Sequence, residues 1–246
     1  MSVLLLRPEH KIAASQYAFA QAGIECVGVA LQRCLPCDDL VAKIKQIEWQ
    51  GVKHVVFTSS VAAKWTLPLL PELHSSCLIY AIGNGTFQTL AQWTSKDPFW
   101  CNGHRIFRAP KGAEHSEGLL ELHHLQRVLQ EKIVIVKGKG GRTALADTLT
   151  ERGADVVTLC SYERLNLSEP VATHAWQPVD IKTIIVTSGE QVELAFAHFA
   201  SQWLKRCTWL APSQRIVKIL HERGIASVFN TNGASDTDLI STLQNI

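Results

Sequence analysis

Short apolar runs alternate along the chain with stretches in which apolar residues recur every three or four positions. The runs are typical of buried parallel strands, and the wider spacing is typical of amphipathic helices. Strands are expected at 3–6, 26–31, 54–57, 77–82, 106–107, 133–136, 156–164, 185–186 and 210–211 and around Phe229. Helices are expected at 12–20, 40–47, 61–67, 87–93 and 112–122 and through Leu145 and Leu149. Such alternation predicts an α/β fold built on doubly wound parallel sheets.

The stretch from Lys132 to Arg164 organises the chain. An apolar run leads into a glycine-rich segment, 137–142, and then into helical spacing and a β-branched strand. Loops that leave the carboxyl ends of parallel strands are where doubly wound sheets bind ligands, so residues 137–142 are expected at a ligand site. The last strand continues to Arg164, and we interpret that overrun as a crossing between two domains.

The second half of the chain repeats the first. Residues 4–8 and Gly23 correspond to 134–138 and Gly153, and 153 minus 23 gives an offset of 130. Residues 56–59 correspond to 185–188, and residues 81–84 to 210–213, at an offset of 129. The repeat predicts two flavodoxin-like domains whose hydroxyl- and glycine-rich loops border one ligand cleft between them.

The composition argues against several classes of function. The 246 residues are 46% hydrophobic, and 24 Lys and Arg stand against 22 Asp and Glu. A nearly neutral chain lacks the field of a nucleic-acid or anionic-membrane binder, so an acidic ligand must be held locally. No signal peptide or transmembrane run is recognisable, which predicts a cytoplasmic protein. The seven scattered cysteines, including Cys101 and the Cys34-x-x-Cys37 pair, predict reduced thiols rather than a disulfide framework or a metal site.

The strand-end loops share small residues, hydroxyls and a few bases, which are Arg7, Lys64, Lys137, Lys139, Arg142 and Arg164. Backbone N–H groups beside helix N-termini bind carboxylates or phosphates without many charged side chains. The glycine-rich segment has neither Walker nor G-x-G-x-x-G spacing, and an ordinary strand-to-helix turn remains an alternative. The hydroxyls of 58–60 and 187–188 lie at helix starts, where hydroxyls are most often caps, although their recurrence in both halves favours a shared ligand.

Familiar catalytic sets are missing from the sequence, which has no G-x-S-x-G elbow and no H-E-x-x-H motif. We expect His123 and His124, with Glu121, on the solvated face of an amphipathic helix rather than at a metal. Tyr162 remains, because a tyrosine is a neutral proton donor at pH 7 and is suited to helping a hydroxyl leave. Its position alone favours a buried structural tyrosine over a catalytic one.

Seven segments carry a family resemblance over nearly the whole chain: VLLLRP, VVFTSS, AIGNGT, KGKGGRTALADTLTERGADV with SYER after it, IIVTSG and GASDTDLISTL. In this order and spacing they resemble the uroporphyrinogen-III synthases, cofactor-free enzymes that close linear hydroxymethylbilane into uroporphyrinogen III. The resemblance implies a lyase of heme biosynthesis with two α/β domains joined by a two-stranded β-ladder. The domains would be 1–33 with 168–246, and 38–160, with the ladder at 34–37 and 161–167.

The resemblance also implies the site. The family's important tyrosine falls on Tyr162, and the threonine of its glycine turn falls on Thr86. Its second-half threonine pair falls on Ser213 and Gln214, where Gln214 departs from the pattern. The residues expected to bind the octacarboxylate substrate are Arg7, Thr58, Ser59, Ser60, Gly83, Asn84, Gly85, Thr86, Lys137, Gly138, Gly141, Arg142, Thr187, Ser188, Gly189, Ser213 and Gln214.

The expected chemistry begins when the ring A hydroxyl leaves with a proton from Tyr162 or from a water that Tyr162 positions. The resulting azafulvene is attacked by ring D, and a spiro intermediate recloses with ring D inverted. A monomer is expected, without metal or cofactor, and with a transient contact to hydroxymethylbilane synthase among its partners. Two alternatives stay open: a non-catalytic two-lobed binding module for a small polyanion, and a tetrapyrrole methyltransferase, for which no convincing S-adenosylmethionine loop is present.

Overall fold

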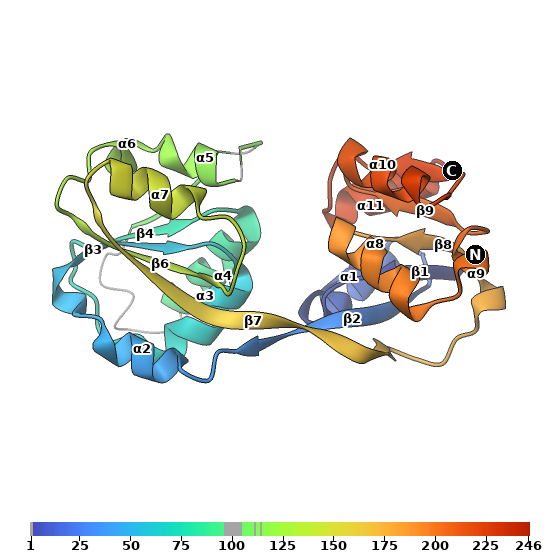
Figure 1. The fold of residues 1–246 in the computed structure, drawn as a ribbon, viewed down its shortest axis with the longest axis horizontal. Helices are drawn as coiled ribbons and strands as arrows, with labels where there is room; N and C mark the ends of the chain where they lie inside the picture. The colour runs from blue at the N-terminus through green and yellow to red at the C-terminus, as the bar shows by residue number, and fades with distance from the viewer. Residues whose placement is uncertain (1, 96–104, 111, 114) are drawn as a thin grey trace. The chain divides into compact units, whose positions relative to one another are not determined.

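The chain forms two compact units in the computed structural model, which describes residues 2–95, 105–110, 112–113 and 115–246. Unit 1 comprises Met1–Cys34 and Leu165–Ile246, and unit 2 comprises Leu35–Arg164. Both chain ends therefore belong to unit 1, which is blue and orange to red in Figure 1, whereas unit 2 is the middle of the chain.

Unit 1 is a parallel sheet with helices on both faces. Its strands are β1 (Ser2–Leu6), β2 (Cys26–Pro36), β8 (Ile181–Ile185), β9 (Thr208–Ala211) and β10 (Val228–Asn230). Its helices are α1 (Glu9–Gln21), the 3-10 turn η3 (Pro178–Asp180), α8 (Gly189–His198), α9 (Ser201–Leu204), α10 (Gln214–Glu222) and α11 (Asp236–Gln244). The order in space is β10-β9-β8-β1-β2, which is the flavodoxin-like order.

Unit 2 contains the remaining strands, β3 (Val52–Phe57), β4 (Leu78–Ala81), β5 (Ile106–Arg108), β6 (Lys132–Gly138) and β7 (Asp155–Ala172). Its helices are α2 (Leu40–Gln46), η1 (Trp49–Gly51), α3 (Ser60–Thr66), η2 (Leu67–Leu69), α4 (Asn84–Thr94), α5 (Ser116–Leu120), α6 (His123–Gln126) and α7 (Ala144–Glu151). The order is β7-β6-β3-β4-β5, so β6 and β7 take the places that β1 and β2 have in unit 1. The α/β fold with two doubly wound parallel sheets is confirmed.

The strands β2 and β7 are neighbours in the strand order, and both continue past a unit boundary. Both are longer than their apolar runs predict, since β2 reaches Pro36 and β7 reaches Ala172. Within unit 1 the amide of Thr173 donates to the carbonyl of Gly28 over 2.9 Å, and within unit 2 the amide of Cys37 donates to the carbonyl of Ser161 over 3.1 Å. Backbone pairing with a neighbouring strand, which the pattern of side chains does not reveal, therefore sets these lengths.

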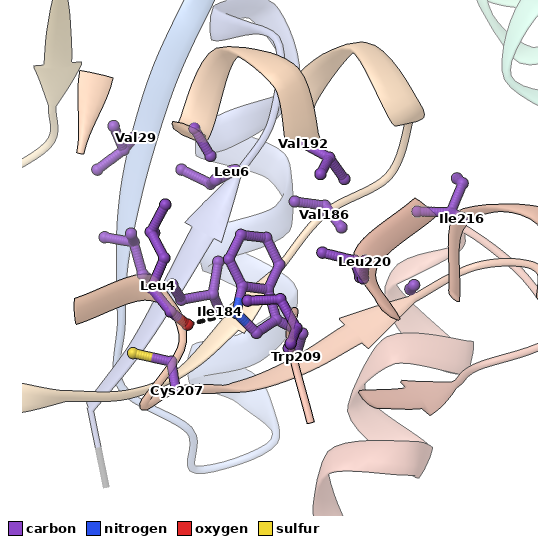
Figure 2. Packing of buried hydrophobic residues seen from close by; sticks show 14 of the residues in the cluster. Leu4, Leu6, Val29, Ile184, Val186, Val192, Cys207, Trp209, Ile216 and Leu220 are labelled. Carbon is purple, nitrogen blue, oxygen red and sulfur yellow. Dashed lines mark hydrogen bonds between the residues drawn. The ribbon is translucent and has the colours of Figure 1, made fainter. Parts of the chain in front are cut away.

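Alternate residues of β1 face two separate cores in unit 1. Leu4 and Leu6 point to the core under α8 and α10, while Val3 and Leu5 point to the core under α1 and α11. Figure 2 shows the indole of Trp209 in the middle of the first core, where its Nε1 donates to the carbonyl of Leu204 over 3.0 Å. Burial of both strand faces explains why the strands of this chain are apolar runs rather than alternating ones.

Three helices differ from the prediction by several residues, and the first is α1, which begins at Glu9 instead of Ile12. Helix α4 begins at Asn84, not Phe87, because Gly83 in extended conformation is its N-cap, so residues 84–86 are its first turn instead of a loop. The helix expected at 112–122 is shorter: α5 begins at Ser116 because His115 accepts the amide of Gly118, and extended Leu122 separates α5 from α6. Lys111 and Glu114, beside and within that expected helix, lie outside the described residues.

No helix of the described residues is long and apolar enough to cross a membrane. No disulfide joins any two of the six described cysteines, whereas Cys101 lies outside the described residues. His124 packs its ring against Phe107 with centroids 4.6 Å apart, and His123 lies beside it on α6. Among the described residues, no three His, Cys, Asp or Glu side chains are grouped so that they could hold a metal ion.

Candidate functional site

A cavity of about 300 Å³ opens in unit 2 at the carboxyl ends of β3 and β6. Its lining residues are Thr58, Ser59, Ile82, Ser116, Ile135, Lys137, Gly138, Gly140, Gly141, Arg142, Leu145, Ala146, Tyr162 and Arg164. From β3 the sheet continues to β4 on one side, and from β6 it continues to β7 on the other, so the chain connections leave in opposite directions here. This is the switch point at which doubly wound sheets bind their ligands.

Tyr162 lies on β7, opposite Gly138 in the strand register, and only 7% of its surface is exposed. A Cβ atom at position 138 would lie 2.6 Å from Cζ of the Tyr162 ring, so the ring occupies the space that glycine leaves empty. The carbonyl of Tyr162 accepts the amide of Lys139 over 2.7 Å, which fixes the backbone of the residue as well. The phenol is thus held at the wall of the cavity.

The glycine-rich loop from Lys137 to Arg142 has a defined shape. Gly140 and Gly141 have φ angles of +75° and +79°, which side chains other than glycine rarely adopt. The Lys137 ammonium donates to the carbonyl of Arg142 over 2.9 Å and closes the loop on itself. Because an ammonium has three donors, Lys137 keeps hydrogens for a ligand in the cavity.

The other two cations of this loop form exposed ion pairs. Arg142 lies 3.5 Å from Glu117, and Lys139 lies 3.1 Å from Glu163. The pKa of the Glu117 carboxyl is lowered, first by a backbone hydrogen bond and then by His115 and Arg142, so Glu117 is ionised at neutral pH. The hydrogen bond to Glu163 raises the pKa of Lys139. Exposed pairs of this kind contribute little to stability, and an anionic ligand can replace the carboxylate.

The three hydroxyls that follow β3 have different environments. The Thr58 hydroxyl donates to the carbonyl of Val136 over 3.3 Å. Ser59 is the N-cap of α3, where its oxygen accepts the amide of Ala62 over 3.1 Å, and its hydroxyl donates to the Tyr162 oxygen over 3.3 Å. Ser60 begins the helix. Ser59 therefore both caps α3 and lines the cavity, two roles that the sequence leaves as alternatives.

The segment from Gly83 to Thr86 lies outside the lining of this cavity, although Ile82 just before it is part of the lining. Asn84 accepts a hydrogen bond from Arg108 over 2.7 Å, and Thr86 is buried. The free amides of a helix N-terminus nevertheless begin at Gly83, so an anion-binding role for Gly83, Asn84, Gly85 and Thr86 stays a prediction.

In unit 1 the loop after β8 resembles the loop after β3. Ser188 is the N-cap of α8 and accepts the amide of Gln191 over 3.2 Å. The buried side chain of Gln191 accepts both the amide and the hydroxyl of Thr187, over 2.7 and 3.0 Å. Gly189 is the first helical residue. The hydrogen of the Thr187 hydroxyl is therefore used in a bond within the protein. Toward a ligand, this hydroxyl can only accept a hydrogen bond.

Arg7 is buried at the carboxyl end of β1, with 6% of its surface exposed. Its Nη2 donates to the carbonyl of Ala234 over 2.6 Å and lies 3.2 Å from the Asp236 carboxylate, which is close enough for an ion pair but not aligned for a hydrogen bond. Burial lowers the pKa of Arg7, and Asp236 opposes that shift. The guanidinium thus anchors the start of α11, and a contact with substrate stays a prediction.

Ser213 and Gln214 lie at the start of α10 in unit 1. Ser213 occupies the N-cap without a side-chain cap bond, and Gln214 is exposed on the first turn. The Ser213 hydroxyl is therefore not committed to its helix, in contrast to Ser59 and Ser188.

The structure adds residues that sequence reasoning does not place at a site. Ser116 and the apolar side chains of Leu145 and Ala146 line the cavity, whereas Gly140 and Arg164, which also line it, belong to the strand-end loops already named from the sequence. Gln191 had a usable signal, because a serine followed three residues later by glutamine is typical of a capping box.

The unit 2 cavity combines one phenol, three cationic side chains and the backbone of a glycine-rich loop. Such a set can bind carboxylates through charge-assisted bonds, each contributing about 1.5–3 kcal/mol, and can deliver a proton from the phenol. No paired carboxylates line the cavity among the described residues, so acid–base chemistry of that type has no support here.

Comparison with known proteins identifies relatives of the same kind. Residues 13–239 match the family model described as uroporphyrinogen-III synthase HemD. The chain is 33% identical over 187 residues to the uroporphyrinogen-III synthase of Escherichia coli (strain K12), covering 74% of this chain and 69% of that protein. It is 33% identical over 143 residues to the Salmonella typhimurium enzyme of the same name, covering 56% of this chain and 58% of that protein.

Solved structures bear on the fold. The uroporphyrinogen-III synthetase from Helicobacter pylori 26695 matches with a TM-score of 0.58 at 17% identity and covers 100% of both chains. A mutant uroporphyrinogen III synthase from the extremely thermophilic bacterium Thermus thermophilus matches with a TM-score of 0.55 at 16% identity, again over 100% of both chains. The family match over nearly the whole sequence, together with the relative at 33% identity, shows that this chain belongs to the uroporphyrinogen-III synthase family.

Proposed function

We propose that the protein converts linear hydroxymethylbilane into uroporphyrinogen III, with Tyr162 as the proton donor that helps the ring A hydroxyl leave. The observation that supports this role is the position of the phenol: it lines a cavity at the sheet's switch point and is held there from two sides. Of the three tyrosines in the chain, Tyr80 is fully buried and Tyr17 is 68% exposed on α1, so neither has this setting.

The cavity would receive one part of the substrate rather than all of it. Its volume of about 300 Å³ lies at the lower end of the range for small-ligand pockets, and a tetrapyrrole with eight carboxylates is larger. The cationic groups of Lys137, Arg142 and Arg164 support binding of the carboxylates nearest the reacting hydroxyl. The backbone of Gly138 and Gly141 and the hydroxyls of Thr58 and Ser60 are proposed to complete this set.

The unit 1 loops are proposed to bind further carboxylates. Thr187, Ser188 and Gly189 lie at the end of β8, which occupies the place that β3 has in unit 2. The hydroxyl of Ser213 and the side-chain amide of Gln214 are proposed to donate hydrogen bonds to a carboxylate at the start of α10. The first turn of α4, from Gly83 to Thr86, is proposed to bind a carboxylate through its free backbone amides.

Catalysis is proposed to depend on two things, proton donation by Tyr162 and orientation of the substrate. Loss of hydroxide from a carbon next to a pyrrole ring is assisted when a phenol protonates the leaving oxygen. The cation that forms is then attacked by ring D, and the fixed ends of the substrate decide which carbon of ring D reacts. Because the electron-rich pyrrole also assists departure, removal of Tyr162 is expected to slow turnover rather than abolish it.

The test measures product isomers. Hydroxymethylbilane is incubated with the wild type, Tyr162→Phe and the control Tyr17→Phe, and uroporphyrinogens I and III are separated after oxidation. We expect the wild type and Tyr17→Phe to form isomer III alike, and Tyr162→Phe to form it about 10- to 100-fold more slowly. A wild type that forms only isomer I would contradict the function, while a fully active Tyr162→Phe variant would contradict the role of Tyr162 alone.

A further inference from the structure

We infer that Ser59 is a positioning residue for Tyr162: its hydroxyl donates to the phenol oxygen and so turns the phenol hydrogen toward the cavity. This inference rests on the proposed role of Tyr162 as proton donor. It gives Ser59 a task that differs from carboxylate binding, because Ser59 acts on the substrate through Tyr162.

The hydrogen bond runs from Ser59 to Tyr162, and this direction is compatible with the cap of α3. A serine hydroxyl has one hydrogen and two lone pairs. The Ser59 oxygen accepts the amide of Ala62 over 3.1 Å, which uses one lone pair and leaves its hydrogen for a second partner. Its hydrogen then serves the bond of 3.3 Å to the Tyr162 oxygen, in which the phenol is the acceptor. The hydrogen of Tyr162 is not needed for either bond and is available to a ligand.

The neighbouring hydroxyl shows why the task falls on Ser59. The Thr58 hydroxyl donates to the carbonyl of Val136, which is a backbone group of β6. Thr58 therefore ties β3 to β6, whereas Ser59, one residue later at the N-cap, reaches across to β7. The two hydroxyls thus bond to different strands and have separate roles.

The Tyr162 ring is held on its other side by Gly138. A Cβ atom at 138 would lie 2.6 Å from Cζ and 2.9 Å from the hydroxyl oxygen, which leaves the ring no room for a methyl group there. With Gly138 against the ring and Ser59 at its oxygen, the phenol has one position and one hydrogen direction. A preorganised donor of this kind loses little entropy when the substrate binds.

The experiment is a double-mutant cycle with Ser59→Ala, Tyr162→Phe and the double variant, assayed for uroporphyrinogen III formation. We expect Ser59→Ala to lower kcat about 3- to 10-fold with little change in KM, as the loss of one hydrogen bond implies. In the Tyr162→Phe background the same change is expected to have no effect on kcat, because no phenol oxygen remains to be oriented.

A conservative variant and a matched cap control separate positioning from folding. Ser59→Thr keeps the hydroxyl and the cap and is expected to retain kcat. Ser188→Ala removes the equivalent cap bond of α8 in unit 1, so it calibrates the fall in Tm that a lost cap alone causes. If Ser59→Ala lowers kcat equally in both backgrounds, or not at all, the inference is wrong. If the wild type fails to form isomer III, the proposed function fails instead.

Discussion

Gly138 and Tyr162 face each other across β6 and β7, and the aromatic ring lies where a side chain at position 138 would be. Position 138 must be glycine for the phenol of Tyr162 to lie at the cavity wall, because the ring passes over a residue without a Cβ atom. In unit 1 the offset of 130 residues places Pro8 and Gln32 at the equivalent positions, so the repeat has kept the fold without this pair.

Gly138→Ala is predicted to displace the Tyr162 ring and to lower kcat at least about tenfold. Overpacking of this kind costs roughly 1–3 kcal/mol, which the chain can relieve by moving the ring. Steady-state turnover to uroporphyrinogen III measures the effect. Gly51→Ala is the control, since a Cβ atom there meets only Lys132 Cδ at 3.9 Å. Wild-type turnover in Gly138→Ala would show that the ring position is not critical.

Lys137→Met is predicted to raise KM roughly tenfold, because it removes a charge from the cavity and opens the loop that the bond to the Arg142 carbonyl closes. KM is compared at about 50 and about 300 mM salt, where the wild-type value is expected to rise with salt more steeply than that of the variant. Lys53→Met, at the opposite end of β3, removes the same charge away from the cavity and is expected to leave KM unchanged. Equal KM values for Lys53→Met and Lys137→Met would refute a local role.

His54→Leu is predicted to lower the free energy of unfolding by about 1–3 kcal/mol. His54 bridges the buried Tyr80 hydroxyl at 3.1 Å and the Glu131 carboxylate at 2.6 Å, so the variant leaves a buried phenol without its partner. Adding Tyr80→Phe removes that orphaned group, and the double variant is expected to be less destabilised than the two single changes added together. Urea unfolding followed by circular dichroism measures this, and strict additivity would argue against a coupled pair.

Alkaline pH is predicted to destabilise the protein through its buried thiols. Burial raises the pKa of Cys77 from 9.0 to about 12, so its native state keeps the proton longer than the unfolded chain does. The resulting stability is complete below about pH 9 and is lost as the pH rises from about 9 towards 12. Burial likewise raises the pKa of Cys26 and Cys207 to about 11.

Unfolding in urea at about pH 8 and about pH 10 tests the prediction. The fall in unfolding free energy between these two values is expected to be smaller by roughly 1 kcal/mol in Cys77→Ala than in the wild type. Cys160→Ala, which removes a half-buried thiol, serves as the comparison. An identical fall in the wild type and Cys77→Ala would mean that this thiol does not titrate with folding.

Local pattern accounts for most of the fold but not for its element ends. The apolar runs of Leu4–Leu6 and Val134–Val136 identify strands because both faces are buried, and the repeat indicates the shared strand order. The start of α4 at Asn84 and of α5 at Ser116 escaped prediction, because an extended Gly83 and a His115 side chain act as caps. Caps depend on individual hydrogen bonds, which periodicity does not record.

The sequence by itself determined the order of strands and helices, the twofold repeat, the glycine loop at a strand end, and the family. Each of these depends on residues that are close together along the chain or on a pattern that recurs. Only the tertiary structure decided which side chains meet: Ser59 and Tyr162 are separated by 103 positions, and a one-residue change in strand register would part them. Tertiary packing likewise decided that Arg7 is buried. Its guanidinium can leave water because it donates to the carbonyl of Ala234, which is 227 positions away along the chain.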